Sequence, residues 1–65
     1  MNIKPGTLVK DIDHGICTIV NCTKTGHQYE RYYEYEMLTP LGTIVTTDEY
    51  ELRSDKVKII QEREK

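Results

Sequence analysis

Short apolar stretches alternate with turn-forming residues along the whole chain. They predict five strands, over residues 7–10, 16–23, 28–38, 43–47 and 57–60. Several of these stretches are rich in β-branched or aromatic residues, and each is bounded by Gly, Pro, Asp or short polar residues, which is typical of strands and their turns. Helical periodicity nowhere extends beyond about two turns. The pattern therefore predicts an all-β fold.

The connections predict how the strands are arranged. Pro5 and Gly6 form a turn that starts the first strand, and Gly15 ends a polar corner before the second. We expect further turns at residues 24–27 and 39–42. Residues 48–52 predict a single helical turn, with Asp48 as its N-cap and with Tyr50 and Leu52 covering one end of the fold. Five strands with a short helical turn before the last one favour a small SH3-like or Tudor-like barrel.

The longest predicted strand, residues 28–38, holds four of the five tyrosines of the chain. Its charged residues do not keep to one face, which predicts a bulge near Tyr32 and Tyr33. In the preceding strand, Cys17 and Cys22 are five residues apart, so a regular strand places them on opposite faces. This argues against a disulfide between them and favours reduced thiols in a cytoplasmic protein.

Length and charge limit the functions that fit. A chain of 65 residues forms a single domain, which we expect to have its core in residues 3–60 and a charged tail in residues 61–65. Such a chain buries only about 60% of its unfolded surface, which leaves little room for an enclosed active site, and we expect no enzyme. The formal net charge of −2 predicts weak or absent direct binding of nucleic acid.

Other candidate chemistry is sparse. Asp11, Asp13 and His14 lie together in the polar corner, where such residues usually cap the backbone of a turn. The two cysteines lack CxxC spacing, so we expect neither a metal site nor a cofactor. No hydrophobic segment follows Met1, so we expect no membrane span.

Two surfaces are candidates for binding. Residues 43–47, TIVTT, carry no charge, and they form either a central strand or an exposed edge that pairs with a strand of another protein. Alternatively, Tyr29 and Tyr32 beside Arg31 form a stacking surface for a nucleic acid or a small ligand. The competing interpretation is that the tyrosines supply the aromatic core, because the chain has no Trp and no Phe.

The run KPGTLVKDIDHGICTIV resembles the start of the RNA-polymerase-interacting domain of CarD-type transcription regulators and the transcription-repair coupling factor. In that family a G-D-x-V-V strand leads to a His-Gly corner and an apolar strand. The matching positions here are Gly6, Leu8, Val9, His14, Gly15 and Ile16. The likeness extends over about residues 3–53, with Thr7 in place of the family's Asp.

The resemblance implies a Tudor-like barrel that binds the β subunit of bacterial RNA polymerase and modulates transcription. The binding residues that it implies are Lys24, Thr43, Ile44, Val45 and Thr46. A barrel without the family's second module would suit a phage protein. We expect a monomer, or a weak dimer formed by strand pairing.

Overall fold

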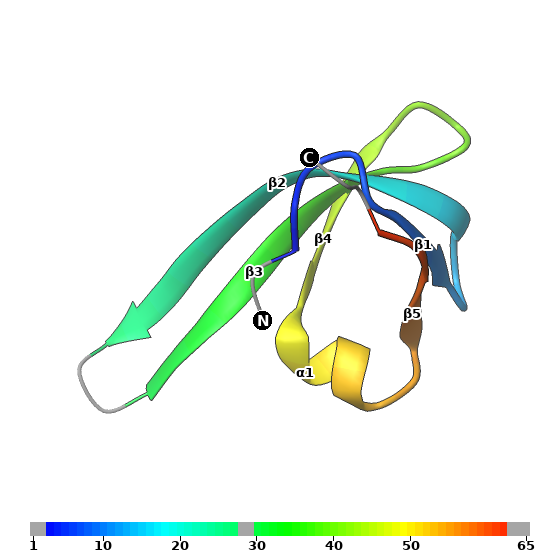
Figure 1. The fold of residues 1–65 in the computed structure, drawn as a ribbon. Coiled ribbons are helices and arrows are strands. Elements are labelled where there is room, and N and C mark those ends of the chain that lie inside the picture. Colours follow the sequence, from blue (N-terminus) through cyan, green and yellow to red (C-terminus); the bar gives the residue numbers. More distant parts are fainter. Residues whose placement is uncertain (1–2, 28–29, 63–65) are drawn as a thin grey trace.

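The computed structural model of the protein describes residues 3–27 and 30–62. Its elements are β1 (Leu8–Asp11), β2 (Gly15–His27), β3 (Glu30–Leu38), β4 (Ile44–Asp48), α1 (Glu49–Arg53) and β5 (Val57–Gln61). Figure 1 shows β2 and β3 as a long twisted hairpin that extends beyond the rest of the fold. The predicted strands all exist, with boundaries that differ from the prediction by at most four residues. The tip of the hairpin lies outside the described residues.

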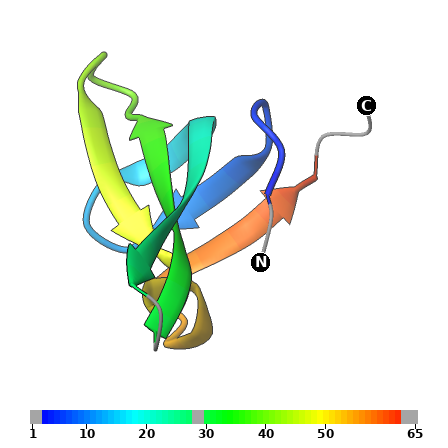
Figure 2. The ribbon, with the colours of Figure 1, turned by 90° about the vertical axis from the view of Figure 1, so that its left-hand side faces the viewer.

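All neighbouring strands are antiparallel and form one sheet in the order β4-β3-β2-β1-β5. The all-β class and the short helix before the last strand are therefore confirmed. The predicted barrel is not closed, because no pairing joins β4 to β5 among the described residues. Figure 2 shows these two strands diverging from α1, so the sheet is curled and open on one side.

The concave face of the sheet holds the core. Its buried apolar side chains come from every strand except β4 and from the N-terminal lead: Ile3, Val9, Cys17, Ile19, Tyr35, Met37 and Val57. Val45 of β4 and Leu52 of α1 pack against this cluster. Tyr35 is the single tyrosine buried completely among those described, and Tyr33 is partly buried and packs against the same cluster, so the aromatic-core interpretation holds for these two rings. No described helix has the length and apolar character that crossing a membrane requires.

A β-bulge in β2 changes which of its side chains point to the core. The register with β3 shifts between Ile19 and Asn21, opposite Met37 and Glu36. The predicted bulge near Tyr32 and Tyr33 is therefore wrong in position. The extra residue, Val20, reverses the alternation, so that both Cys17 and Cys22 pack on the core side. The prediction that the two cysteines face opposite sides was wrong for this reason, although neither cysteine forms a disulfide, as expected.

Two further predictions about local structure need correction. Residues 24–27 continue β2 and form no turn, because Gly26 is accommodated within the strand at a positive φ of 108°. Tyr50 does not cover the core, since its side chain is 45% exposed, whereas Leu52 packs against the core as predicted. The predicted cap is confirmed: the Asp48 carboxylate accepts a hydrogen bond from the Glu51 N–H at 3.1 Å.

Candidate protein-binding edge

β4 is an edge strand. It pairs with β3 and with no other described strand, which decides between the two interpretations of residues 43–47. The Thr39 N–H donates to the Thr43 carbonyl at 2.8 Å, so the backbone of Thr43 points toward β3. Because this direction alternates along an antiparallel pair, the backbone groups of Ile44 and Thr46 point away from the sheet. They are available to a further strand.

The side chains of β4 alternate in the same way. Ile44 is 54% exposed and Thr46 is exposed, and both lie on the convex face of the sheet. Val45 is half-buried against the core, and Thr47 is buried and donates its hydroxyl hydrogen to a Glu51 carboxylate oxygen. Of the residues that the family resemblance implied, Ile44 and Thr46 therefore present side chains and backbone at the edge. The Val45 side chain packs against the core instead.

An apolar stripe crosses the convex face from this edge. Ile44 is paired with Leu38, Leu38 with Thr18, and Thr18 with Leu8 in successive register positions. Ile44 and Leu38 are both large exposed apolar side chains, as are Ile16 and Val20 on either side of Thr18. A strand added to β4 would extend this stripe rather than cover it, because partners in a ladder lie in the plane of the sheet.

The other end of the edge is acidic. On the convex face Glu34 lies directly opposite Asp48, and Glu36 lies opposite Thr46. Glu36 accepts a hydrogen bond from the Asn21 side-chain amide at 3.2 Å. Like charges directly opposite each other on neighbouring strands are destabilising. The edge therefore runs from an uncharged end at Ile44 to a negatively charged end at Asp48.

A buried carboxylate fixes the point where β4 becomes α1. Glu49 accepts a hydrogen bond from the Tyr33 N–H at 2.8 Å and pairs with Arg53 at 3.0 Å. The carboxylate therefore takes the place that a strand carbonyl would occupy opposite β3. The Tyr33 N–H is the main reason that the pKa of Glu49 lies below its ordinary value of 4.5, with a contribution from Arg53.

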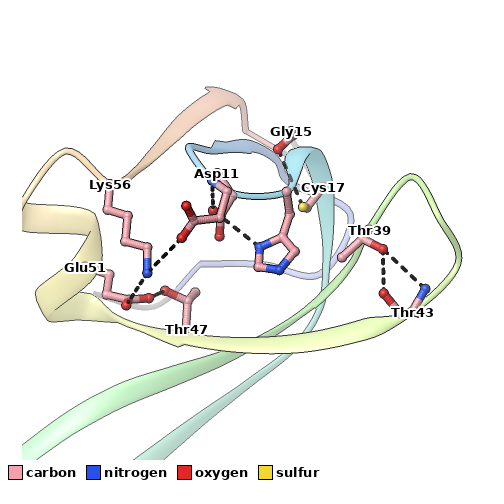
Figure 3. Close-up of polar contacts among 10 residues, drawn as sticks. Asp11, Gly15, Cys17, Thr39, Thr43, Thr47, Glu51 and Lys56 are labelled. Carbon is pink, nitrogen blue, oxygen red and sulfur yellow. Dashed lines mark hydrogen bonds and ion pairs between the residues drawn. The ribbon is translucent and has the colours of Figure 1, made fainter.

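Lys56 ties the helix to the corner between β1 and β2. Figure 3 shows its side chain pointing toward Glu51. The Lys56 Nζ lies 3.1 Å from a Glu51 carboxylate oxygen and 3.3 Å from one of Asp13. These contacts, first with Glu51 and then with Asp13, raise the pKa of Lys56. Because Thr47 of β4 also bonds to Glu51, this network connects β4, α1 and the β1–β2 corner across the open side of the sheet.

The acidic corner has a structural role, as predicted. Asp11 is buried and accepts a hydrogen bond from the Asp13 N–H at 2.7 Å, and the His14 ring nitrogen Nδ1 lies 3.4 Å from the same oxygen. The Asp13 carboxylate is engaged by Lys56. Within residues 3–27 and 30–62, no group of three or more His, Cys, Asp or Glu side chains is placed to hold a metal ion.

The remaining predicted site residues lie elsewhere. Lys24 is exposed on β2, which β3 separates from β4, and its Nζ lies 5.7 Å from the centroid of the Tyr33 ring. The structure does not bring Lys24 to the edge. Tyr29 lies outside the described residues, and Tyr32 is half-buried. Its ring centroid lies 5.5 Å from that of Tyr50. No sequence pattern indicates this pairing, because α1 and β3 come together only in the folded protein.

Comparisons with protein-family models, with curated proteins and with solved structures gave no match to this chain. The case for a function therefore depends on the residues and their geometry.

Proposed function

We propose that this protein is a non-enzymatic, cytoplasmic interaction module with an SH3-like or Tudor-like fold. In this proposal its β4 edge binds the β subunit of bacterial RNA polymerase and so modulates transcription. The observation that carries the proposal is that β4 has an open outer side and no charged side chain from Thr43 to Thr47. The polymerase as partner comes from the sequence resemblance, and the open edge supplies a means of binding.

Binding would occur by strand addition. The partner contributes an exposed strand, and its backbone exchanges hydrogen bonds with the N–H and C=O groups of Ile44 and Thr46. Such main-chain bonds provide affinity with little dependence on sequence, while alternate side chains provide specificity. Ile44 is placed to pack against the partner's side chain on the convex face, next to Leu38.

The test compares two exposed isoleucines at opposite edges of the sheet. Ile44 on β4 is 54% exposed and Ile60 on β5 is 50% exposed. We expect Ile44→Lys to abolish binding of the purified β subunit, measured by biolayer interferometry, and Ile60→Lys to leave it unchanged. Thermal unfolding followed by circular dichroism checks that both variants fold. Binding that survives Ile44→Lys in a folded protein contradicts this mechanism.

A second candidate function uses the tyrosines. The pair formed by Tyr32 and the 45%-exposed Tyr50 provides an aromatic surface of the kind on which a base or a cation can stack. Binding of labelled single-stranded DNA or RNA tests this alternative, and it should fall in a Tyr50→Ala variant. Unchanged binding in that variant rejects the tyrosine pair as the site.

A further inference from the structure

We infer that the strand added to β4 carries an apolar side chain and, four residues away, a basic one. This inference rests on the proposed function, because it assumes that β4 is where the partner binds. The partner is thus a protein edge strand of defined chemistry. Its apolar side chain would lie beside Ile44 and its cation beside Asp48.

The spacing follows from the geometry of the edge. Ile44, Thr46 and Asp48 alternate with the core-facing Val45 and Thr47, so they share the convex face. Side chains of directly paired residues in adjacent strands lie on the same face. A strand paired with β4 therefore places every second side chain next to one of these three residues. The positions next to Ile44 and Asp48 are four residues apart.

The negative charge at the Asp48 end of the β4 edge favours a basic side chain on the partner strand. Glu34 lies directly opposite Asp48 on the neighbouring strand, and Glu36 is the next residue on the same face of β3. Glu34 forms no ion pair with another of the described residues, and Asp48 is engaged by the Glu51 N–H as a helix cap. A basic side chain on the added strand would offset the repulsion between these carboxylates, which an acidic side chain would increase.

The opposite edge has the opposite charge. On the convex face of β1 and β5, Lys10 lies directly opposite Lys58, and both are exposed. Within the described parts of the chain neither forms an ion pair. A basic strand is therefore attracted to the β4 edge and repelled by the β5 edge. The two open edges of one sheet are distinguished by charge, and this directs the partner to β4.

The test uses synthetic β-hairpins with one open strand. That strand reads Lys-x-Thr-x-Ile, or the reverse order, because a strand can add to β4 in either direction. Matched hairpins have Glu in place of Lys.

Fluorescence anisotropy measures binding of these hairpins to the wild-type chain and to a Glu34→Gln, Asp48→Asn double variant. Asn remains a good helix cap, so this variant keeps the start of α1. The control is Asp55→Asn, which removes one negative charge from an exposed residue outside the edge and keeps a side chain suited to its positive φ of 69°.

We expect a Lys hairpin to bind more tightly than its Glu counterpart, with the preference decreasing as salt increases. The double variant should weaken Lys binding by about twofold to fivefold, chiefly through the loss of the directly opposed Asp48 charge. Asp55→Asn should have no effect. Equal binding of Lys and Glu hairpins, binding of neither, or a preference that survives the double variant would overturn the inference.

The same variants separate this inference from the proposed function. If the β subunit binds through Ile44 but tolerates the double variant, the partner chemistry is wrong and the proposed function stands. If the Lys hairpins bind as expected and the β subunit does not bind at all, the partner chemistry is supported and the polymerase is rejected.

Discussion

Proline substitutions at two adjacent residues of β4 test the edge geometry directly. The Thr46 N–H points away from β3, whereas the Thr47 N–H points toward it, opposite Tyr35. Proline lacks an N–H and is tolerated in sheets where that group faces solvent at an edge. Thr46→Pro should therefore preserve the fold, and Thr47→Pro should damage it.

The structure sets the size of the difference. Thr47→Pro leaves an acceptor on β3 unpaired, which costs about 1 to 3 kcal/mol, and it loses the hydroxyl bond to Glu51, worth about 1 kcal/mol. The total of about 2 to 4 kcal/mol corresponds to a drop in Tm of at least about 8 °C for a domain of this size. Thr46→Pro loses no ladder bond, so its effect should stay within about 1 kcal/mol.

Urea and thermal unfolding followed by circular dichroism measure these values. Thr46→Pro should also weaken binding of the β subunit by at least about tenfold, because it removes a donor from the open edge. Equal destabilisation by the two prolines would show that the backbone of Thr46 is not directed to solvent. A folded Thr46→Pro variant with full binding would show that strand addition at β4 is not the mode of binding.

Three further predictions concern the stability of the fold. Folding lowers the pKa of Glu49, so the ionised carboxylate adds to the free energy of unfolding above pH 4.5, the ordinary pKa of the group. This stabilisation is lost as the pH falls through the folded pKa, and Glu49→Gln should reduce the acid sensitivity in unfolding experiments. Burial raises the pKa of Tyr35 from 10 to about 12, so the free energy of unfolding should fall as the pH rises above 10. Tyr35→Phe should remove this part of the loss of stability at alkaline pH. Met37 is completely buried, so Met37→Ala should cost about 2 to 5 kcal/mol in urea titrations, against Glu36→Ala as an exposed control.

The C-terminal end of β4 is both the acidic end of the edge and the end that α1 anchors. Asp48 caps α1, and Thr47 and Lys56 both bond to Glu51. These contacts hold the C-terminal end of β4 in place, while its start at Ile44 lies where β4 and β5 are far apart in Figure 2. A partner strand that pairs first with the uncharged end of the edge would approach the carboxylates as it extends toward α1.

Part of the candidate site was predictable from the sequence. The uncharged run 43–47 marked a strand that could serve as an edge, but a strand of this composition also fits the centre of a sheet. Lys24 was grouped with that strand by resemblance alone, and the structure separates them by the full width of β3. The opposed pair of Glu34 and Asp48 could not be predicted, because it depends on the register between two strands.

The sequence by itself determined the elements that local chemistry governs. Apolar β-branched runs formed strands, and Asp48 capped a helical turn at the predicted position, because these preferences act between residues close in the chain. The tertiary structure alone decided which strands lie at the edges and which side chains share a face. One extra residue at Val20 turned the Cys22 side chain to the core face of the sheet. Within residues 3–27 and 30–62, β4 does not pair with β5, which leaves both edges open. These properties depend on register and on contacts between distant segments, which no local pattern encodes.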